Sequence, residues 1–228
     1  MTHTPVLVVM LTYNDCTVSD AAEIFAQCKE SAAEYWGFKE APLPLPEMQA
    51  LFAEMKRCGK KTVLEVVAYT EEECRAGAEM AVACGCDYLM GTVFSDAVCA
   101  LCKAHGIRYM PFVGEVFDRP SVLEGSIDGM IAEAKSYLAK GAYGIDLLGY
   151  RFTGDAPALI RRFTEAVGAP VCIAGSVNSF ARLDELKAIS PAAFTIGSAF
   201  FDGCFGGSFP EQIDKVCAYM KEPAAALC

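Results

Sequence analysis

Two acidic residues lie inside otherwise apolar segments of this chain. Glu65 is part of TVLEVVA (62–68), and Asp146 is part of GIDLLG (144–149). Burying an ionised carboxylate in apolar surroundings carries a large desolvation penalty, so we expect both side chains to point into a polar site. Lys39, at the end of another short apolar segment, is the natural cation to meet them. Such a cluster suits proton transfer next to a carbonyl group. A purely structural ion cluster is the alternative.

Two turns near the C-terminus have the composition of phosphate-binding loops. In both AGSVN (174–178) and IGSAF (196–200), an apolar segment ends in glycine and a small hydroxyl residue. Glycine lets the backbone approach a ligand closely, and amides at a helix start attract anions. The first turn leads into a helix with Ser179 as its expected cap. The predicted phosphate contacts are the backbones of Gly175, Ser176, Gly197 and Ser198.

Other loops offer further polar contacts. Asn14 and Asp15 come directly after the first apolar segment and are placed to bind substrate hydroxyl groups. The alternative is ordinary turn chemistry, which favours the same residue types. Arg151 is a candidate second phosphate contact because its planar fork matches that geometry. A solvated loop is the alternative there.

A weak internal similarity raises the question of a second anion site. MGTVFSD (90–96) resembles IGSAFFD (196–202), and the two are separated by about half of the chain. If this reflects two related halves, Gly91-Thr92 forms a second cup. Chance similarity between two short apolar segments is the alternative.

Apolar segments alternate with helical patterns along the whole chain, which favours a parallel sheet covered by helices. Eight such units, with phosphate-type turns after the last two, predict a closed (β/α)8 barrel, an α/β fold, over residues 1–228 as one domain. A doubly wound open sheet is the alternative. The expected strands are 6–11, 35–38, 62–67, 88–90, 108–112, 144–148, 170–173 and 194–196.

Composition narrows the classes of function. The net charge of −10 argues against nucleic acid or an anionic membrane as partner. No basic, apolar leader precedes the first strand, so we expect a cytoplasmic protein. The expected partner is a phosphorylated small molecule, because the two glycine turns have the composition of phosphate-binding loops. Whether it forms a homo-oligomer is left open. No Gly-x-Gly-x-x-Gly follows the first strand, which makes a nicotinamide cofactor unexpected.

Cysteine and histidine usage is also informative. Most of the 12 cysteines lie on apolar faces, where the thiol packs as a small hydrophobic group. The CALC segment (99–102) has redox spacing but falls inside an expected helix, which favours packing. The two histidines are His3, near the terminus, and His105, at the expected end of a helix. We therefore predict neither histidine catalysis nor a metal site, and no cofactor.

The segment PVCIAGSVNSFARLDELKAISPAAFTIGSAFF (170–201) resembles the ribulose-phosphate-binding barrel superfamily. That group includes phosphoribosyl isomerases, ribulose-phosphate epimerase, indole-glycerol-phosphate synthase and the small phosphogluconate aldolases. The resemblance implies a phosphorylated small-molecule substrate held by the two glycine turns. It implies no particular reaction, because one fold hosts many.

The chain also departs from several branches of that superfamily. Where the histidine-pathway isomerases carry an acid on the fifth strand, this chain has Met110-Pro111-Phe112. The decarboxylase motif Asp-x-Lys-x-x-Asp on the third strand is replaced by LEVVA (64–68). The histidine ligands of the metal-dependent epimerases are missing as well.

Two mechanisms fit these residues. In an isomerase or epimerase, Glu65 or Asp146 removes a proton next to the carbonyl of the phosphorylated substrate, and the other carboxylate or Lys39 handles the oxygen. In an aldolase, Lys39 forms a Schiff base. Carboxylates beside Lys39 would raise its pKa, which ranks isomerisation first. A barrel that binds a phosphorylated metabolite without turning it over is the third interpretation.

Overall fold

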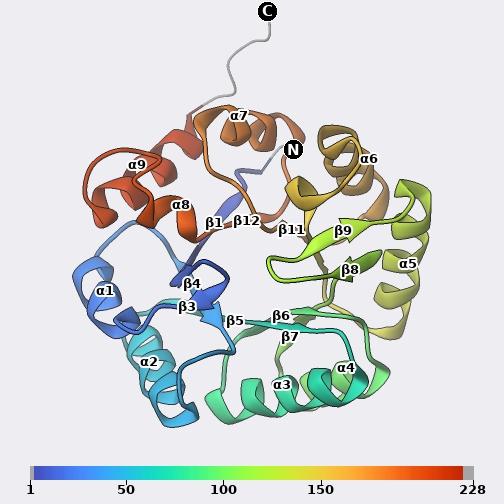
Figure 1. Ribbon diagram of the computed structural model, residues 1–228, viewed down its shortest axis with the longest axis horizontal. Coiled ribbons are helices and arrows are strands. Elements are labelled where there is room, and N and C mark those ends of the chain that lie inside the picture. The colour runs from blue at the N-terminus through green and yellow to red at the C-terminus, as the bar shows by residue number, and fades with distance from the viewer. Residues whose placement is uncertain (1–2, 223–228) are drawn as a thin grey trace, which may run out of the picture.

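A computed structural model describes residues 3–222 and shows a ring of parallel strands enclosed by helices (Figure 1). Neighbouring strands follow the order β10-β11-β12-β1-β4-β5-β6-β7. The (β/α)8 barrel predicted from the sequence is therefore confirmed. The strands are β1 Val6–Met10, β4 Tyr35–Lys39, β5 Lys61–Ala68, β6 Tyr88–Thr92, β7 Arg108–Met110, β10 Ile145–Leu147, β11 Val171–Ile173 and β12 Ala193–Ile196.

The helices around the barrel begin and end close to the positions that their capping residues predict. Ser95, Ser126 and Ser179 each accept a hydrogen bond from a first-turn amide of the following helix. The first helix begins after Asp20, without a side-chain cap. The helices are α1 Ala21–Cys28, α2 Leu45–Arg57, α3 Glu71–Cys84, α4 Asp96–Ala104, α5 Ile127–Lys140, α6 Ala156–Val167, α7 Phe180–Ile189, α8 Ser198–Phe201 and α9 Phe209–Lys221.

The barrel closes between β7 and β10 through an incomplete ladder. The amide of Tyr143 donates to the carbonyl of Tyr109 at 2.9 Å, and the amide of Asp146 donates to that of Pro111 at 3.0 Å. A regular parallel bridge there would also need residue 111 to donate to the carbonyl of Tyr143. Proline has no N–H, so that bond cannot form. This seam explains why β7 and β10 end the ladder order.

The barrel interior has an apolar lower part and a polar upper part. Val8, Val63, Met90 and Cys172 belong to a buried apolar cluster inside the ring. Toward the carboxyl ends of the strands, Lys39 and Glu65 are register partners on β4 and β5. Register partners on parallel strands share a face of the sheet. The fold therefore places a lysine and a carboxylate side by side inside the barrel.

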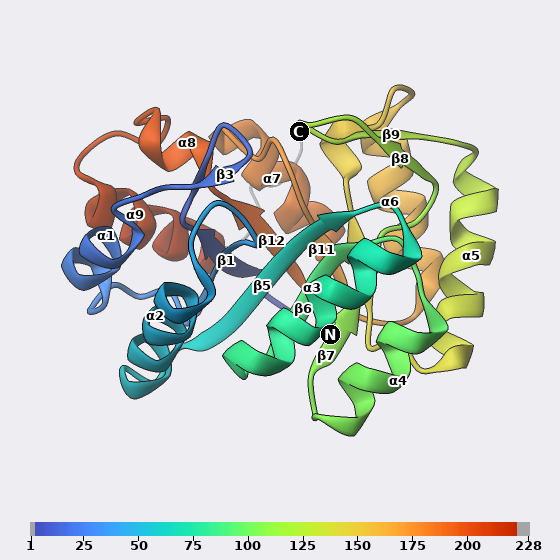
Figure 2. The same ribbon diagram turned by 60° about the horizontal axis from the view of Figure 1, so that its bottom comes forward.

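Two antiparallel hairpins extend the barrel at this same end (Figure 2). One joins β2 (Thr12–Tyr13) to β3 (Cys16–Thr17), and the other joins β8 (Glu115–Phe117) to β9 (Val122–Glu124). Neither pair of short strands was predicted from the sequence. In the first hairpin the two central residues, Asn14 and Asp15, have φ values of 47° and 66°. That conformation belongs to two-residue hairpin turns, which favour Asn and Asp.

Two features bear on partners and redox chemistry. Among residues 3–222, every helix is too short or too polar to cross a bilayer. The cysteines in that range are all free thiols, and Cys28, Cys74 and Cys172 are buried, as expected for packing. Cys99 and Cys102 lie buried in α4. Their thiol pKa values are raised by burial, which does not favour redox chemistry.

Candidate functional site

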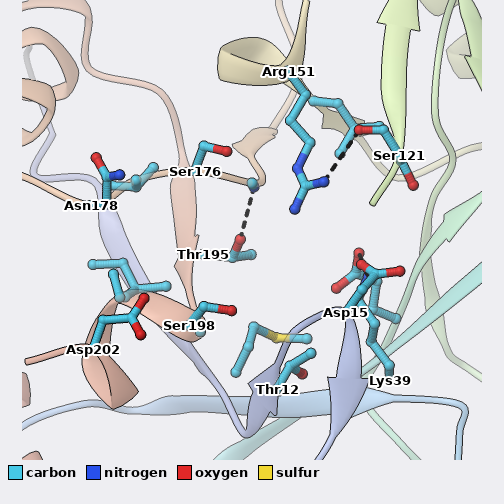
Figure 3. Close-up of a pocket in the computed structure, with 18 of the residues that line it drawn as sticks. Thr12, Asp15, Lys39, Ser121, Arg151, Ser176, Asn178, Thr195, Ser198 and Asp202 are labelled. Atoms are coloured by element: carbon cyan, nitrogen blue, oxygen red, sulfur yellow. Dashed lines mark hydrogen bonds and ion pairs between the residues drawn. The ribbon is translucent and has the colours of Figure 1, made fainter. Parts of the chain in front are cut away.

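A pocket of about 230 Å³ opens at the carboxyl end of the barrel. It is lined by residues from the ends of β1, β4, β5, β11 and β12, together with the 3-10 turn η1 (Gly149–Arg151) and the second hairpin. In (β/α)8 enzymes the active site lies at this end. Figure 3 shows its polar side chains: one group around Lys39, the other around Arg151 and the glycine turns.

A buried charged cluster forms one end of the pocket. The Nζ atom of Lys39 lies 2.5 Å from Oδ1 of Asp15 and 3.4 Å from Oε1 of Glu65. The side chains of Lys39 and Asp15 are each 8% exposed. Burial acts to lower the pKa of Lys39, but the carboxylates of Glu65 and Asp15 outweigh it and hold that pKa above its ordinary value. Lys39 is therefore an ammonium group at neutral pH.

Asp15 enters this cluster because of the hairpin turn that carries it. The turn directs the Asp15 carboxylate down to Lys39, while Asn14 remains exposed and outside the pocket lining. The Asn14 backbone amide instead donates to Oγ of Ser198 at 3.3 Å, which ties the hairpin to the last turn. Of the two residues predicted to bind substrate hydroxyl groups, Asp15 lines the pocket and Asn14 does not. Within residues 3–222, Oδ2 of Asp15 is buried and has no hydrogen-bond partner.

Asp146 lies deeper than the sequence suggested. It is fully buried and is not among the residues that line the pocket. Neither carboxylate oxygen has a hydrogen-bond partner in the described part of the chain. Burial first, and then repulsion from Glu65, raise the pKa of Asp146 well above its ordinary value despite the opposing charge of Lys39. Asp146 therefore does not open into the pocket as expected, because its register partner on β11 is Cys172, a member of the apolar cluster inside the ring.

The two glycine turns form the opposite end of the pocket. Gly175 and Ser176 have φ values of 78° and 58°. A Cβ on Gly175 would lie 2.5 Å from Nε of Arg151, so glycine is needed for this close approach. Arg182 holds the turn from outside, donating to the carbonyl of Ser176 and, at 3.1 Å, to Oδ1 of Asn178.

The second glycine turn follows β12 directly. Gly197 packs so closely on the first hairpin that a Cβ would lie 2.8 Å from the carbonyl oxygen of Thr12. Ser198 begins the four-residue helix α8, and both residues line the pocket. Because β11 and β12 are adjacent parallel strands, their two turns lie side by side. All four predicted phosphate-contact residues are thus brought to one end of the pocket.

Arg151 adds a positive charge to this end. Its Nη1 atom donates to the carbonyl of Ser121 at 3.3 Å, and its guanidinium group points toward the space between Ser176 and Asp15 (Figure 3). The Nε atom is buried and lacks a hydrogen-bond partner among the described residues. A guanidinium with a free donor beside two glycine turns is well suited to bind phosphate.

The predicted second anion cup at Gly91-Thr92 is not an open site. Thr92 is fully buried, and its hydroxyl group lies 2.6 Å from the hydroxyl of Tyr109. Gly91 packs against Glu65, where a Cβ would approach Cγ to 2.9 Å. The role of Gly91 is therefore close packing beneath the charged cluster.

Several lining residues were not predicted from the sequence, among them Ser121, Thr195, Asp202 and Cys204. Ser121 comes from the second hairpin, which had no recognisable pattern. Thr195 lies in a strand, and its Oγ1 accepts a hydrogen bond from the amide of Gly175 at 3.4 Å. The alternation of inward and outward residues along 193–196 could have indicated Thr195, because it places that residue on the inner face.

The fold and pocket together define a (β/α)8 barrel with a polar pocket at the carboxyl ends of its strands. Solved structures similar to this chain include three enzymes of this architecture. A 4-hydroxy-2-oxoglutarate/2-dehydro-3-deoxyphosphogluconate aldolase superposes with a TM-score of 0.67 and 15% identity, covering 94% of each chain. A Mycobacterium tuberculosis tryptophan synthase chain gives 0.68 and 13%, covering 96% of this chain and 94% of the other. Orotidine 5'-phosphate decarboxylase from Pyrococcus horikoshii gives 0.65 and 14%, covering 95% of this chain and 100% of the other.

These similarities establish the fold. No protein-family model and no curated protein sequence matches the chain. The similar structures have the (β/α)8 architecture that the resemblance to the ribulose-phosphate-binding barrels implies, so that expectation is confirmed for the fold. At identities of 13–15%, the chemistry must be argued from the site itself.

Proposed function

We propose that this protein is an enzyme that binds a small phosphorylated carbohydrate or carbohydrate-like metabolite and moves a proton next to its carbonyl group. One observation carries the proposal: a single pocket joins a phosphate-type end, with Arg151, to a buried lysine between two carboxylates. The names of the similar structures are compatible with this, since they include an aldolase of a phosphorylated sugar acid and a decarboxylase of a 5'-phosphate.

The proposed phosphate contacts are the turns after β11 and β12. Gly175 and Ser176 supply one side, Gly197 and Ser198 supply the other, and Arg151 supplies the positive charge. A local site of this kind is needed, because the protein as a whole carries a net charge of −10 and repels an anionic ligand.

The proposed reacting end is the Lys39 cluster. Asp15 makes the shorter contact and holds Lys39 in place, while Glu65, at 3.4 Å, is the more weakly engaged carboxylate. Glu65 is therefore the proposed base that removes the proton next to the carbonyl. The Lys39 ammonium stabilises the negative charge that develops on the carbonyl oxygen and returns a proton to it. This enolisation is shared by isomerases and epimerases, which remain the first interpretation.

A Schiff-base aldolase is the second candidate, favoured by the single lysine that lines the pocket. That chemistry needs a neutral amine, whereas the pKa of Lys39 is raised by its carboxylate neighbours despite burial. Substrate would first have to displace one carboxylate. Borohydride reduction in the presence of substrate separates the two: a stable Lys39 adduct detected by mass spectrometry would replace the isomerase interpretation with the aldolase.

The phosphate end can be tested with a matched pair of variants at Ser176. This residue has a positive φ, which Asp and Asn both tolerate. Ser176→Asp places a carboxylate in the proposed phosphate site, whereas Ser176→Asn has nearly the same shape without the charge. We expect inorganic phosphate and sugar phosphates to bind the wild type and Ser176→Asn, and to bind Ser176→Asp at least tenfold more weakly by calorimetry. Equal affinity in the two variants would show that phosphate binds elsewhere or not at all.

Binding without turnover is the remaining alternative. The Ser176 pair does not distinguish it, because a non-catalytic barrel would use the same phosphate site. The distinguishing variant is Glu65→Gln, which should retain phosphate binding and abolish proton transfer.

A further inference from the structure

The reacting end of the pocket has an excess of negative charge. At this end Lys39 lies beside two acids, Asp15 and Glu65, whereas the third acid of the lining, Asp202, lies beside Ser198 (Figure 3). Arg151 lies at the phosphate end, where its charge is opposed by the ligand. Lys39 already contacts both Asp15 and Glu65. A second anionic group on the substrate would therefore find no uncommitted cation at the Lys39 end of the described pocket.

Asp15 also presents an unused acceptor there. Its Oδ1 accepts from Lys39 at 2.5 Å, and its Oδ2 is buried without a partner. The Asp15 side chain is only 8% exposed. A buried oxygen that lacks a donor carries a desolvation penalty, which a hydroxyl group on the ligand would remove. An ionised carboxylate is an acceptor only, so it cannot satisfy another carboxylate group.

We propose that Asp15 is a specificity residue that accepts a hydrogen bond from a substrate hydroxyl group and rejects a carboxylate at that position. The substrate is then a phosphorylated polyhydroxy aldehyde or ketone rather than a phosphorylated sugar acid. This inference rests on the proposed function, because it assumes that the phosphate occupies the glycine-turn end. It separates this chain from barrels whose substrates carry both a phosphate and a carboxylate.

Matched ligands test the inference without knowledge of the true substrate. Glycerol 3-phosphate and 3-phosphoglycerate have the same length and differ in one terminal group, a hydroxymethyl or a carboxylate. Erythritol 4-phosphate and 4-phosphoerythronate form a second, longer pair, which allows for the span between the two ends. The measurement is calorimetric titration at constant ionic strength. For the pair whose alcohol binds more tightly, we expect the wild type to bind that alcohol at least tenfold more tightly than the acid of the same pair.

Asp15→Asn should reverse part of this preference. The asparagine oxygen can still accept from Lys39, while its amide group now offers a donor where Oδ2 stood. We expect the ratio of the affinity for the alcohol to the affinity for the acid to fall by about tenfold, a size typical of one hydrogen bond to a charged group. Glu165→Gln, on the exposed face of α6, makes the same change in net charge away from the pocket and should leave the ratio unchanged.

The outcomes separate this inference from the phosphate site. Inorganic phosphate can bind while the wild type binds the acids as tightly as the alcohols, or binds neither. Either result would disprove the role of Asp15 and leave the phosphate site standing. If inorganic phosphate also fails to bind, the proposed function fails and the inference fails with it. An unchanged ratio in Asp15→Asn would contradict the inference even if the wild type prefers alcohols.

Discussion

Lys39 is the residue on which the charged cluster depends. Replacing it by methionine keeps the length of the side chain but leaves Asp15 and Glu65 as buried carboxylates without a cation. Removing one partner of a buried ion pair costs about 3–5 kcal/mol, so we expect Lys39→Met to lower the free energy of unfolding by that amount at neutral pH. Chemical denaturation measures this directly.

The matched control for Lys39→Met is a triple variant that also carries Asp15→Asn and Glu65→Gln. If the buried charges cause the loss, the triple variant will regain most of the stability, although it has fewer native groups. A triple variant no more stable than Lys39→Met would indicate lost packing. The pKa of Lys39 is raised in the fold, so its contribution is present at neutral pH and declines only above about pH 10.4.

Asp146 should make the stability of the wild type depend on pH in the opposite sense from an ion-paired acid. Its pKa is raised by burial, so the folded protein keeps a proton that the unfolded chain releases above about pH 3.9. Stability therefore falls as pH rises from that value toward the raised pKa, by up to about 1.4 kcal/mol per pH unit. In Asp146→Asn this part of the slope should disappear. Urea denaturation at a series of pH values is the measurement, and an unchanged slope would contradict it.

Part of the site was predictable at the level of single residues. Lys39 and Glu65 were identified because a charged residue in an apolar strand must face a polar site, and the structure brings them together. The same rule could not give depth. Asp146 is paired with Cys172 of the interior apolar cluster, and it is fully buried without lining the pocket. The sequence could not show that Asp15, rather than Asn14, contacts Lys39. That depends on the hairpin turn between two very short strands.

At the scale of elements, the second hairpin is a cover fixed by a few polar contacts. The hydroxyl of Tyr69 donates to the carbonyl of Asp118 at 2.8 Å and lies 2.9 Å from Oγ of Ser121. Arg119 adds contacts to Glu40 at 2.5 Å and to the carbonyl of Val67 at 2.6 Å. These bonds hold Ser121 over the pocket, where its carbonyl in turn accepts from Arg151.

Tyr69→Phe should loosen this hairpin without unfolding the barrel. It removes both hydroxyl contacts, each worth about 1 kcal/mol, and retains the ring. We expect hydrogen exchange over residues 115–124 to become about tenfold faster, with the exchange of β1 and β5 unchanged. Faster exchange throughout the barrel would mean that the hydroxyl supports the whole fold, and no change would mean that Arg119 alone holds the hairpin.

The eight-unit alternation was readable because the helices are long, with capping residues at several starts. The helix 71–84 and the helix 156–167 appear with the expected bounds. The hairpins were missed because strands of two or three residues show no measurable alternation. The seam between β7 and β10 was also missed, because the lost bond depends on which residue faces Pro111.

For the whole molecule, stability should not depend on the redox state of its thiols. The cysteines within residues 3–222 are free, and six of them are buried. The melting temperature should therefore be the same, within about 1 °C, with and without reductant, since a shift of 1 kcal/mol moves Tm by about 2–4 °C for a domain of this size. A clear decrease with reductant would reveal a stabilising disulfide.

Solvent deuterium exchange tests the central claim most directly. Phosphorylated aldoses and ketoses would be incubated with the protein in D₂O and followed by proton NMR at the carbon next to the carbonyl. We expect at least one compound to lose that proton signal with the wild type, and to retain it with Glu65→Gln and with Ser176→Asp. Binding of several compounds at the phosphate end with exchange in none of them would contradict an enzyme of this class, as would exchange that continues unchanged in Glu65→Gln.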